Sequence, residues 1–210
     1  FALNPGVSLG VAQVEASASA TSFSLIDPLN AQTINRKELV KAACCNLSEA
    51  FETNASVDAS FTDAVTGTKQ IRMLGLDGKY SQIQVDNLPG PRGLSAVLGL
   101  TFIPGDWVDA IQISKGAGSV TGGHESMTGQ INVAMKNPNN ADPFHANLYG
   151  NGAGRLEWNH VSTHQVSRKW RTAILTHALY NGTQNDRNAD GFLDTPLQRH
   201  VIARNEWKYQ

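Results

Sequence analysis

The chain has 210 residues, of which 40% are hydrophobic, and its formal net charge is −1. These values exclude a strongly basic nucleic-acid-binding protein and a highly charged disordered tail, and they allow one or two folded domains. No segment approaches the ~20 consecutive apolar residues of a transmembrane helix, so any contact with a membrane would have to be made by β-structure.

The chain begins at Phe1 and shows no signal peptide, from which we expect a processed chain or a fragment. Residues 1–30 are rich in Ala, Ser, Val and Asn and have almost no charge. We therefore predict an extended N-terminal segment, because such residues lack the periodic apolar positions of a helix.

A helix is predicted over residues 36–51. Asn35 followed by Glu38 resembles a capping box, and apolar residues at helical spacing follow it. These apolar residues are Leu39, Ala43, Leu47 and Phe51. We expect them to share the buried face of the helix.

The two cysteines, Cys44 and Cys45, are adjacent in the sequence. Neighbouring Cα atoms lie ~3.8 Å apart, whereas ordinary disulfides need ~4.4 Å or more. The pair therefore predicts no disulfide framework. It is either two small buried residues of the helix, or a metal-binding or redox pair.

Strands and loops follow the predicted helix. Residues 69–76 and 80–89 are strand-like, and Asp77-Gly78 between them predicts a hairpin turn. Beyond a Gly- and Pro-rich loop at 90–105, the pattern indicates a short helical turn over 105–109 and a strand over 110–115. A further strand is predicted over 129–136, and residues 137–143 have the composition of a linker.

The stretch GAGSVTGGHESMTGQINVAMK, residues 116–136, contains five glycines followed by an alternating apolar run. It lacks the GxxxxGK[ST] arrangement of a phosphate-binding loop. A strand follows the glycines where a dinucleotide fingerprint would need a helix. We expect the glycines to form tight turns between strands, where φ is positive or no side chain fits.

Beyond residue 143, segments of about ten residues alternate polar and apolar positions, as membrane β-strands do. In the last of them, Val201, Ala203, Trp207 and Tyr209 share one face, and His200, Arg204, Glu206 and Lys208 share the other. Four strands are predicted, over 144–151, 155–166, 170–181 and 198–210. Short connections alternate with the long loop 181–196, as in transmembrane barrels, whose turns are short on one side and long on the other.

The order of these motifs resembles the plug domain of TonB-dependent outer-membrane receptors, in particular the Bacteroidetes type. The resemblance rests on the blocks CCNLSEAFETN, IRMLGLDG, VDNLPG and VDAIQISKGAGSVTGGHESMTGQINVAMK, and it covers about residues 25–137. The chain departs from the family pattern at Met73-Leu74, at Asn87 and at Gly123-His124-Glu125. These departures concern details of the plug.

The resemblance implies an α+β plug domain followed by antiparallel β-strands of a truncated transmembrane β-barrel. It places an extended N-terminal segment at 1–30, the plug domain at 31–138 and the first four strands of an outer-membrane barrel at 139–210. Four strands cannot close a barrel, and an open sheet edge is not viable in lipid. We therefore expect the 210 residues to be the N-terminal part of a longer receptor.

The resemblance also implies partners. The protein would lie in the outer membrane of a Gram-negative bacterium, with the plug in the barrel lumen and the N-terminus in the periplasm. A TonB box would add as a strand to TonB, which transmits force from an inner-membrane motor. The β-prone stretch ahead of the plug is the expected TonB box. Its residues are Leu9, Gly10, Val11, Ala12, Gln13 and Val14. A plain flexible tail is the alternative.

The expected function is energised uptake of a scarce nutrient: a metal complex, a siderophore, haem, cobalamin or a glycan. We expect the ligand to meet plug loops at Arg92, His124 and Glu125. Two alternatives remain open: a ligand-sensing signalling receptor, and a soluble calcium-dependent β-rich binding protein. No Ser/His/Asp or paired-carboxylate arrangement stands out, so we do not expect an enzyme. The net charge of −1 gives no reason to expect a nucleic-acid partner.

Loop 181–196 has the spacing D-x-N-x-D-G-x-x-D, which matches positions 1 to 9 of a calcium-binding loop. The expected ligands are the side chains of Asp186, Asn188, Asp190 and Asp194 and the carbonyl of Phe192. Leu197 stands where position 12 usually carries Glu. The alternative is a polar outer loop rich in Asx turns. Apart from this ion, no cofactor is required.

Overall fold

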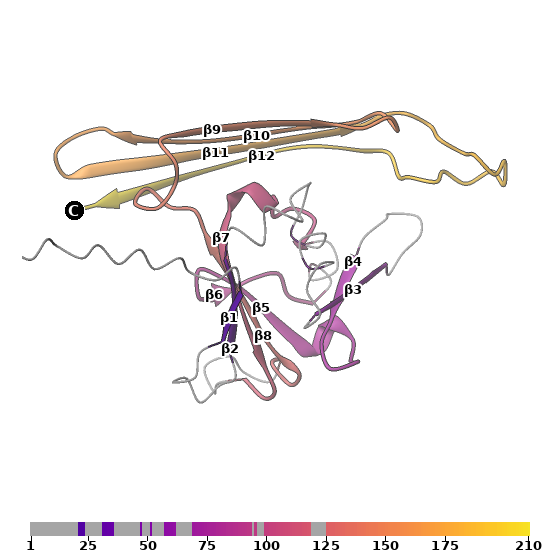
Figure 1. Ribbon diagram of the computed structural model, residues 1–210, viewed down its shortest axis with the longest axis horizontal. Helices are drawn as coiled ribbons and strands as arrows, with labels where there is room; N and C mark the ends of the chain where they lie inside the picture. The colour runs from indigo at the N-terminus through magenta and orange to yellow at the C-terminus, as the bar shows by residue number, and fades with distance from the viewer. Residues whose placement is uncertain are drawn as a thin grey trace, which may run out of the picture.

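The computed structural model describes residues 21–23, 31–35, 47, 51, 57–61, 69–93, 95, 99–118 and 125–210. They form two parts (Figure 1). The N-terminal unit, the described part of residues 21–136, is built on a six-stranded sheet. The second part, which we call the wall, is a four-stranded antiparallel sheet that lies across one end of the N-terminal unit. None of the described helices is long and apolar enough to cross a membrane.

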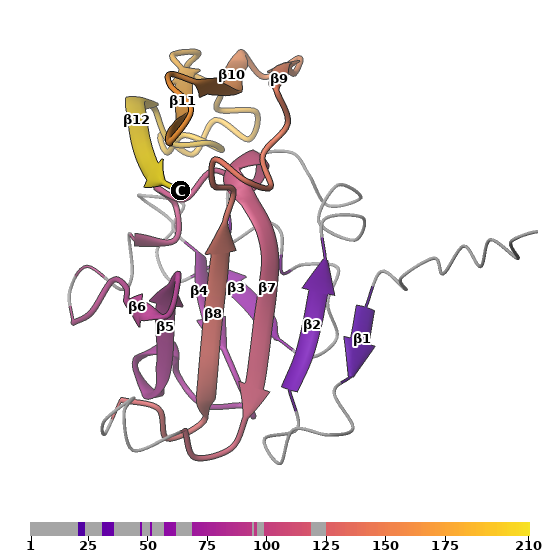
Figure 2. The same ribbon diagram turned by 90° about the vertical axis from the view of Figure 1, so that its left-hand side faces the viewer.

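The six-stranded sheet has the order β1-β2-β7-β8-β5-β6. Its strands are β1 (Thr21–Phe23), β2 (Ala31–Asn35), β5 (Ser81–Val85), β6 (Leu88–Pro89), β7 (Val108–Lys115) and β8 (Gly129–Met135). All neighbouring pairs are antiparallel except β5 and β8, which run parallel. In Figure 2, β8 runs along the length of the sheet towards the wall, and β7 runs beside it in the opposite direction.

β3 (Asp58–Phe61) and β4 (Lys69–Arg72) form a separate two-stranded antiparallel sheet. This pairing shows that the predicted hairpin turn at Asp77-Gly78 is wrong. Asp77 instead caps the 3-10 helix η1 (Gly78–Tyr80), with its side chain accepting a hydrogen bond from the Gly78 amide. Because η1 redirects the chain, β5 pairs with β8 and not with β4.

The core of the N-terminal unit includes aliphatic side chains from β2, β5, β7 and β8, and Phe51 and Trp107 belong to the same cluster. β7 shows how alternation is kept: Val108, Ile111 and Ile113 are all buried, and the register shifts between Val108 and Ala110. A β-bulge adds one residue, so Val108 and Ile111 face the same side despite their odd spacing. The predicted short turn before this strand is confirmed as η2 (Gly105–Trp107).

The predicted role of the glycines near β8 is confirmed at both ends of the connection that precedes it. Gly116 has φ +96° and Gly129 has φ +152°, conformations that residues with a side chain rarely adopt. A Cβ at Gly129 would also collide with the Ser114 carbonyl oxygen and the Met73 side chain. These glycines therefore serve chain reversal and close packing between β7 and β8.

Only Leu47 and Phe51 of the predicted helix 36–51 are described, with Leu47 in helical conformation, and both side chains are fully buried. Leu39, Ala43 and the Cys44-Cys45 pair lie outside the described residues. In the segment predicted as extended, 1–30, residues 21–23 form β1 at the edge of the six-stranded sheet.

The wall consists of β9 (Phe144–Gly150), β10 (Arg155–Gln165), β11 (Trp170–Asn181) and β12 (Gln198–Tyr209), each paired antiparallel with the next. All four predicted strands are confirmed to within one residue at each end. The connections between them are short, short and long, and the long one spans residues 182–197. Figure 1 shows this loop extending beyond the end of the sheet, away from the C-terminus.

Candidate functional site

The wall and the N-terminal unit share one hydrophobic core. Val161 of β10 and Ala173 and Leu175 of β11 are fully buried, and they belong to the same cluster as Trp107 and Val108. Because side chains alternate along a strand, these three residues define the inner face of the wall. The inner face of the wall is therefore packed against the N-terminal unit.

The hairpin between β5 and β6 holds Asp86, which makes the first polar contact across this interface. Asp86 and Asn87 have φ values of +52° and +62°, as a tight two-residue turn between strands requires. Asn87 is tied to Asn132 of β8 by two hydrogen bonds, both 2.9 Å long. Asp and Asn tolerate positive φ, so the Asp86-Asn87 dipeptide is a sequence signal for a turn. The prediction of one continuous strand over 80–89 is therefore wrong at these two residues.

Both carboxylate oxygens of Asp86 are used. Oδ1 accepts a hydrogen bond of 2.8 Å from the amide of Met135, where β8 ends. Oδ2 accepts one of 2.9 Å from Nη2 of Arg204 on β12, and the same Nη2 lies 2.9 Å from Glu206 Oε2. The Arg204 guanidinium thus bridges an acid of the N-terminal unit and an acid of the wall. The alternation in β12 placed Arg204 on the polar face, and the structure shows that this face is the inner one.

A second set of polar contacts joins η2 to β9. Asp106 Oδ2 accepts a hydrogen bond of 3.1 Å from Asn147 Nδ2 and lies 3.6 Å from His145 Nε2. At the C-terminal end of the wall, Gln210 donates to the side-chain oxygen of Asn139 over 3.3 Å. These polar contacts surround the shared hydrophobic core, so the two parts are joined by both apolar and polar contacts.

Towards the long loop, the inner face of the wall carries a histidine pair. The rings of His177 and His200 have centroids 5.2 Å apart, and His177 Nδ1 is 2.7 Å from the side-chain oxygen of Asn159. Phe102, from the loop of the N-terminal unit that precedes η2, stacks edge-on against His200 with centroids 5.6 Å apart. Nearby on β10, Arg155 and the buried Glu157 form an ion pair. The loop of the N-terminal unit that carries Phe102 therefore contacts the wall through aromatic rings.

The structure brings together two of the three residues expected to meet ligand. Arg92 Nε and Glu125 Oε2 are 3.2 Å apart, joining the loop after β6 to the segment before β8. They border a hollow of about 300 Å³ that is also lined by Lys79, Tyr80 and Met127. His124 lies outside the described residues. That ligand contacts Arg92 and Glu125 stays a prediction.

The acidic loop after β11 is folded by its own side chains. The amides of Gly191 and Phe192 donate to Asp186 and Asp190 over 3.1 and 2.8 Å, and the Asp190 amide donates to Asn188 over 3.3 Å. The amide of Arg187 donates to Asp194 over 3.1 Å. Across the described residues, no three His, Cys, Asp or Glu side chains are placed to hold a metal ion. Calcium binding here stays a prediction.

The expected TonB box, residues 9–14, lies outside the described part of the chain. The described N-terminal strand nearest to it is β1, which pairs with β2 and forms one edge of the six-stranded sheet. Strand addition to TonB at residues 9–14 therefore also stays a prediction.

Comparison with solved structures shows the fold. The ferric enterobactin receptor PfeA of Pseudomonas aeruginosa matches 78% of this chain with 18% identity and a TM-score of 0.54. The ferric yersiniabactin uptake receptor FyuA from Yersinia pestis matches 86% with 12% identity and a TM-score of 0.63. The copper transporter OprC matches 92% with 13% identity and a TM-score of 0.61. The chain spans 26%, 29% and 29% of these three proteins.

A search of curated protein sequences gave no significant match. A family model described as the TonB-dependent Receptor Plug Domain matches residues 25–130, which is half of the chain. This range holds the strands of the six-stranded sheet from β2 to β7 and the Asp86 hairpin. With its plug domain followed by antiparallel barrel-type strands, the chain belongs to the TonB-dependent receptor plug domain family.

Proposed function

We propose that this chain belongs to a TonB-dependent outer-membrane transporter that takes up a scarce nutrient. The observation that carries the proposal is the packing of a plug domain against the inner face of strands whose outer face is apolar and exposed. Such a pair of faces fits a barrel wall between lipid and a plugged lumen.

The outer face can be followed through the strand register. Three aromatic residues, Trp170, Trp207 and Tyr209, lie together at one end of β11 and β12. The centroid of the Trp170 ring is 6.3 Å from that of Trp207 and 5.2 Å from that of Tyr209. Trp158 and Tyr180 lie near the other end. Aromatic residues prefer the two levels where lipid meets water.

The spacing of these aromatic residues fits a bilayer. Trp170 and Tyr180 are ten residues apart on β11. Strands rise about 3.3 Å per residue, which gives a separation of about 33 Å along the strand. With the ~40° tilt usual in membrane barrels, the height is about 25 Å, as tall as the apolar band of such proteins.

The exposed side chains argue against the soluble calcium-dependent alternative. Leu148, Trp158, Val201 and Trp207 are 71%, 43%, 79% and 53% exposed on one face. Water-soluble proteins seldom leave such continuous apolar patches uncovered. A lipid-facing role accounts for them.

The nutrient is a metal complex, siderophore, haem, cobalamin or glycan. The plug loops that carry Arg92 and Glu125 form the floor of its binding site. The matched receptors and the transporter have identities of 12–18%, so their own cargoes do not select among these classes. A signalling receptor is the second reading of the family resemblance, and no contact among the described residues favours it.

The test uses the full-length protein in its native Gram-negative host. Cell fractionation should place it in the outer membrane. A deletion strain should fail to grow when one nutrient of the above classes is limiting, and the wild-type gene should restore growth. Recovery in the soluble fraction would refute the proposal, as would a deletion strain that matches wild type on every limiting nutrient.

A further inference from the structure

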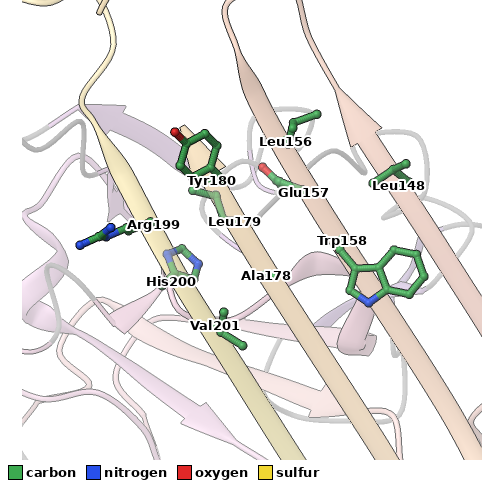
Figure 3. Close-up of a pocket in the computed structure, with 10 residues that line it drawn as sticks. All are labelled: Leu148, Leu156, Glu157, Trp158, Ala178, Leu179, Tyr180, Arg199, His200 and Val201. Atoms are coloured by element: carbon green, nitrogen blue, oxygen red, sulfur yellow. The ribbon is translucent and has the colours of Figure 1, made fainter. Parts of the chain in front are cut away.

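The outer face of the wall is hollowed near the end that carries the long loop. The hollow has a volume of about 380 Å³, within the ~300–1,000 Å³ usual for small-molecule sites. Figure 3 shows Trp158 on one side and Val201 on the other, with Tyr180, Leu156 and Leu148 above them. Nearly all of its surface is apolar.

The strand register explains the hollow. Leu148, Trp158, Ala178 and Val201 are successive partners in one row across the four strands. Ala178 is the small residue of this row, and it lies between Trp158 and Val201. Its short side chain leaves a gap that the larger neighbours surround.

The next row adds a charge at the rim. Leu156 pairs with Tyr180, and Tyr180 pairs with Arg199. Arg199 is exposed, and its side chain makes no hydrogen bond or ion pair with any residue in the described part of the chain. A cation that none of the described residues pairs with thus borders an apolar hollow, at the level of an aromatic residue that prefers the lipid–water boundary.

We propose that this hollow binds one acyl chain of a phosphate-bearing membrane lipid and that Arg199 holds the phosphate. The inference rests on the proposed function, which places the outer face in the membrane. An acyl chain matches the apolar lining. Arginine forms strong charge-assisted hydrogen bonds to phosphate, and it would reach the head group from the edge of the apolar band. The charge and the lining together select an anionic lipid over an uncharged apolar ligand.

Trp158 provides the readout, because brominated acyl chains quench tryptophan fluorescence on contact. The full-length receptor is inserted into phosphatidylcholine vesicles that contain brominated phosphatidic acid or, in parallel, brominated phosphatidylcholine. The Trp158 signal is the difference between the wild type and Trp158→Phe. We expect half-quenching at about a tenfold lower mole fraction of the brominated phosphatidic acid, the effect of one charge-assisted hydrogen bond.

Two variants locate the effect. Arg199→Ala should remove the preference for phosphatidic acid, whereas Arg168→Ala, an exposed arginine in the turn at the opposite end of the strands, should keep it. Ala178→Leu fills the gap and should weaken quenching by both brominated lipids. Equal quenching by the two lipids in the wild type would show contact with bulk lipid only and overturn the proposal. A preference that survives Arg199→Ala would also overturn it.

Flotation of the vesicles separates this inference from the proposed function. A receptor that does not float with the vesicles contradicts the proposed membrane location. A receptor that floats, but whose Trp158 is quenched by neither lipid, contradicts the lipid site alone. In that case another protein surface covers the hollow, and cross-linking would identify a second copy or a partner.

Discussion

Asp86 and Arg204, 118 residues apart in the chain, form an ion pair of 2.9 Å that joins the plug domain to strand β12 of the wall. The pair is anchored on both sides. Asp86 also accepts a hydrogen bond from the Met135 amide, and Arg204 also contacts Glu206. It therefore links the end of β8 to the barrel-type sheet through a single guanidinium group.

Arg204→Met should destabilise the plug–wall contact only slightly. The two side chains are 31% and 38% exposed, and such ion pairs contribute about 0–1 kcal/mol. Asp86→Ala should cost at least about 1 kcal/mol more, because the Met135 hydrogen bond is lost and because alanine tolerates the positive φ of this position less well. The measurement is amide hydrogen exchange of β5 and β8 peptides in the full-length receptor, with Arg168→Met as control. Faster exchange in Arg204→Met than in Asp86→Ala would contradict this order.

Leu47→Ala should destabilise the plug by roughly 2–5 kcal/mol, because the side chain is fully buried against the shared core. Leu88→Ala is the control, since Leu88 is 68% exposed. Hydrogen exchange of plug peptides should accelerate strongly in the first variant and hardly at all in the second. Equal rates in the two variants would mean that Leu47 is not a core residue.

Gly129→Ala should destabilise the plug by more than about 1 kcal/mol. A Cβ at this position would collide with the Ser114 carbonyl oxygen, and the positive φ of Gly129 is unfavourable for alanine. Gly105→Ala is the matched control, as a Cβ there meets no atom within 4 Å. The denaturation midpoint of the full-length receptor measures both. A Gly129→Ala midpoint at the wild-type value would disprove the close approach.

Val11→Pro should abolish energised uptake and leave ligand binding intact, because proline removes a backbone donor that strand addition to TonB requires. Val11→Ala is the control: it retains the backbone donor and should transport normally. Uptake by cells and ligand binding to isolated membranes are measured side by side. Normal uptake in Val11→Pro would place the TonB box elsewhere.

The calcium prediction for loop 181–196 is tested by calorimetric titration of the full-length receptor. We expect saturable binding with Kd of about 10⁻⁴–10⁻³ M, as in extracellular calcium modules, and its loss in Asp190→Ala. Asp109→Ala is the control, since this carboxylate contacts Asn140 outside the loop. Absence of saturable binding to the wild type in this range would leave the loop as a set of Asx turns.

The sequence alone determined the four strands of the wall and the turn and strand around Trp107, while the plug domain was identified by the resemblance of its ordered motifs to a known family. These features depend on local patterns. Side chains alternate with a period of two along every strand, so the residues of one strand already show which face is apolar. The same alternation placed Arg204 on the polar face of its strand, and the structure showed that this face is the inner one.

Tertiary structure decided which segments pair. The pattern of 69–89 allows a hairpin between its two strands, but β4 pairs with β3, and β5 runs parallel to β8. A strand's pattern gives its faces and leaves its neighbour open, because pairing is settled by the packing of residues far apart in the chain. For the same reason the Asp86–Arg204 and Arg92–Glu125 pairs could not be predicted: each joins loops or strands that only the folded sheet brings within hydrogen-bonding distance.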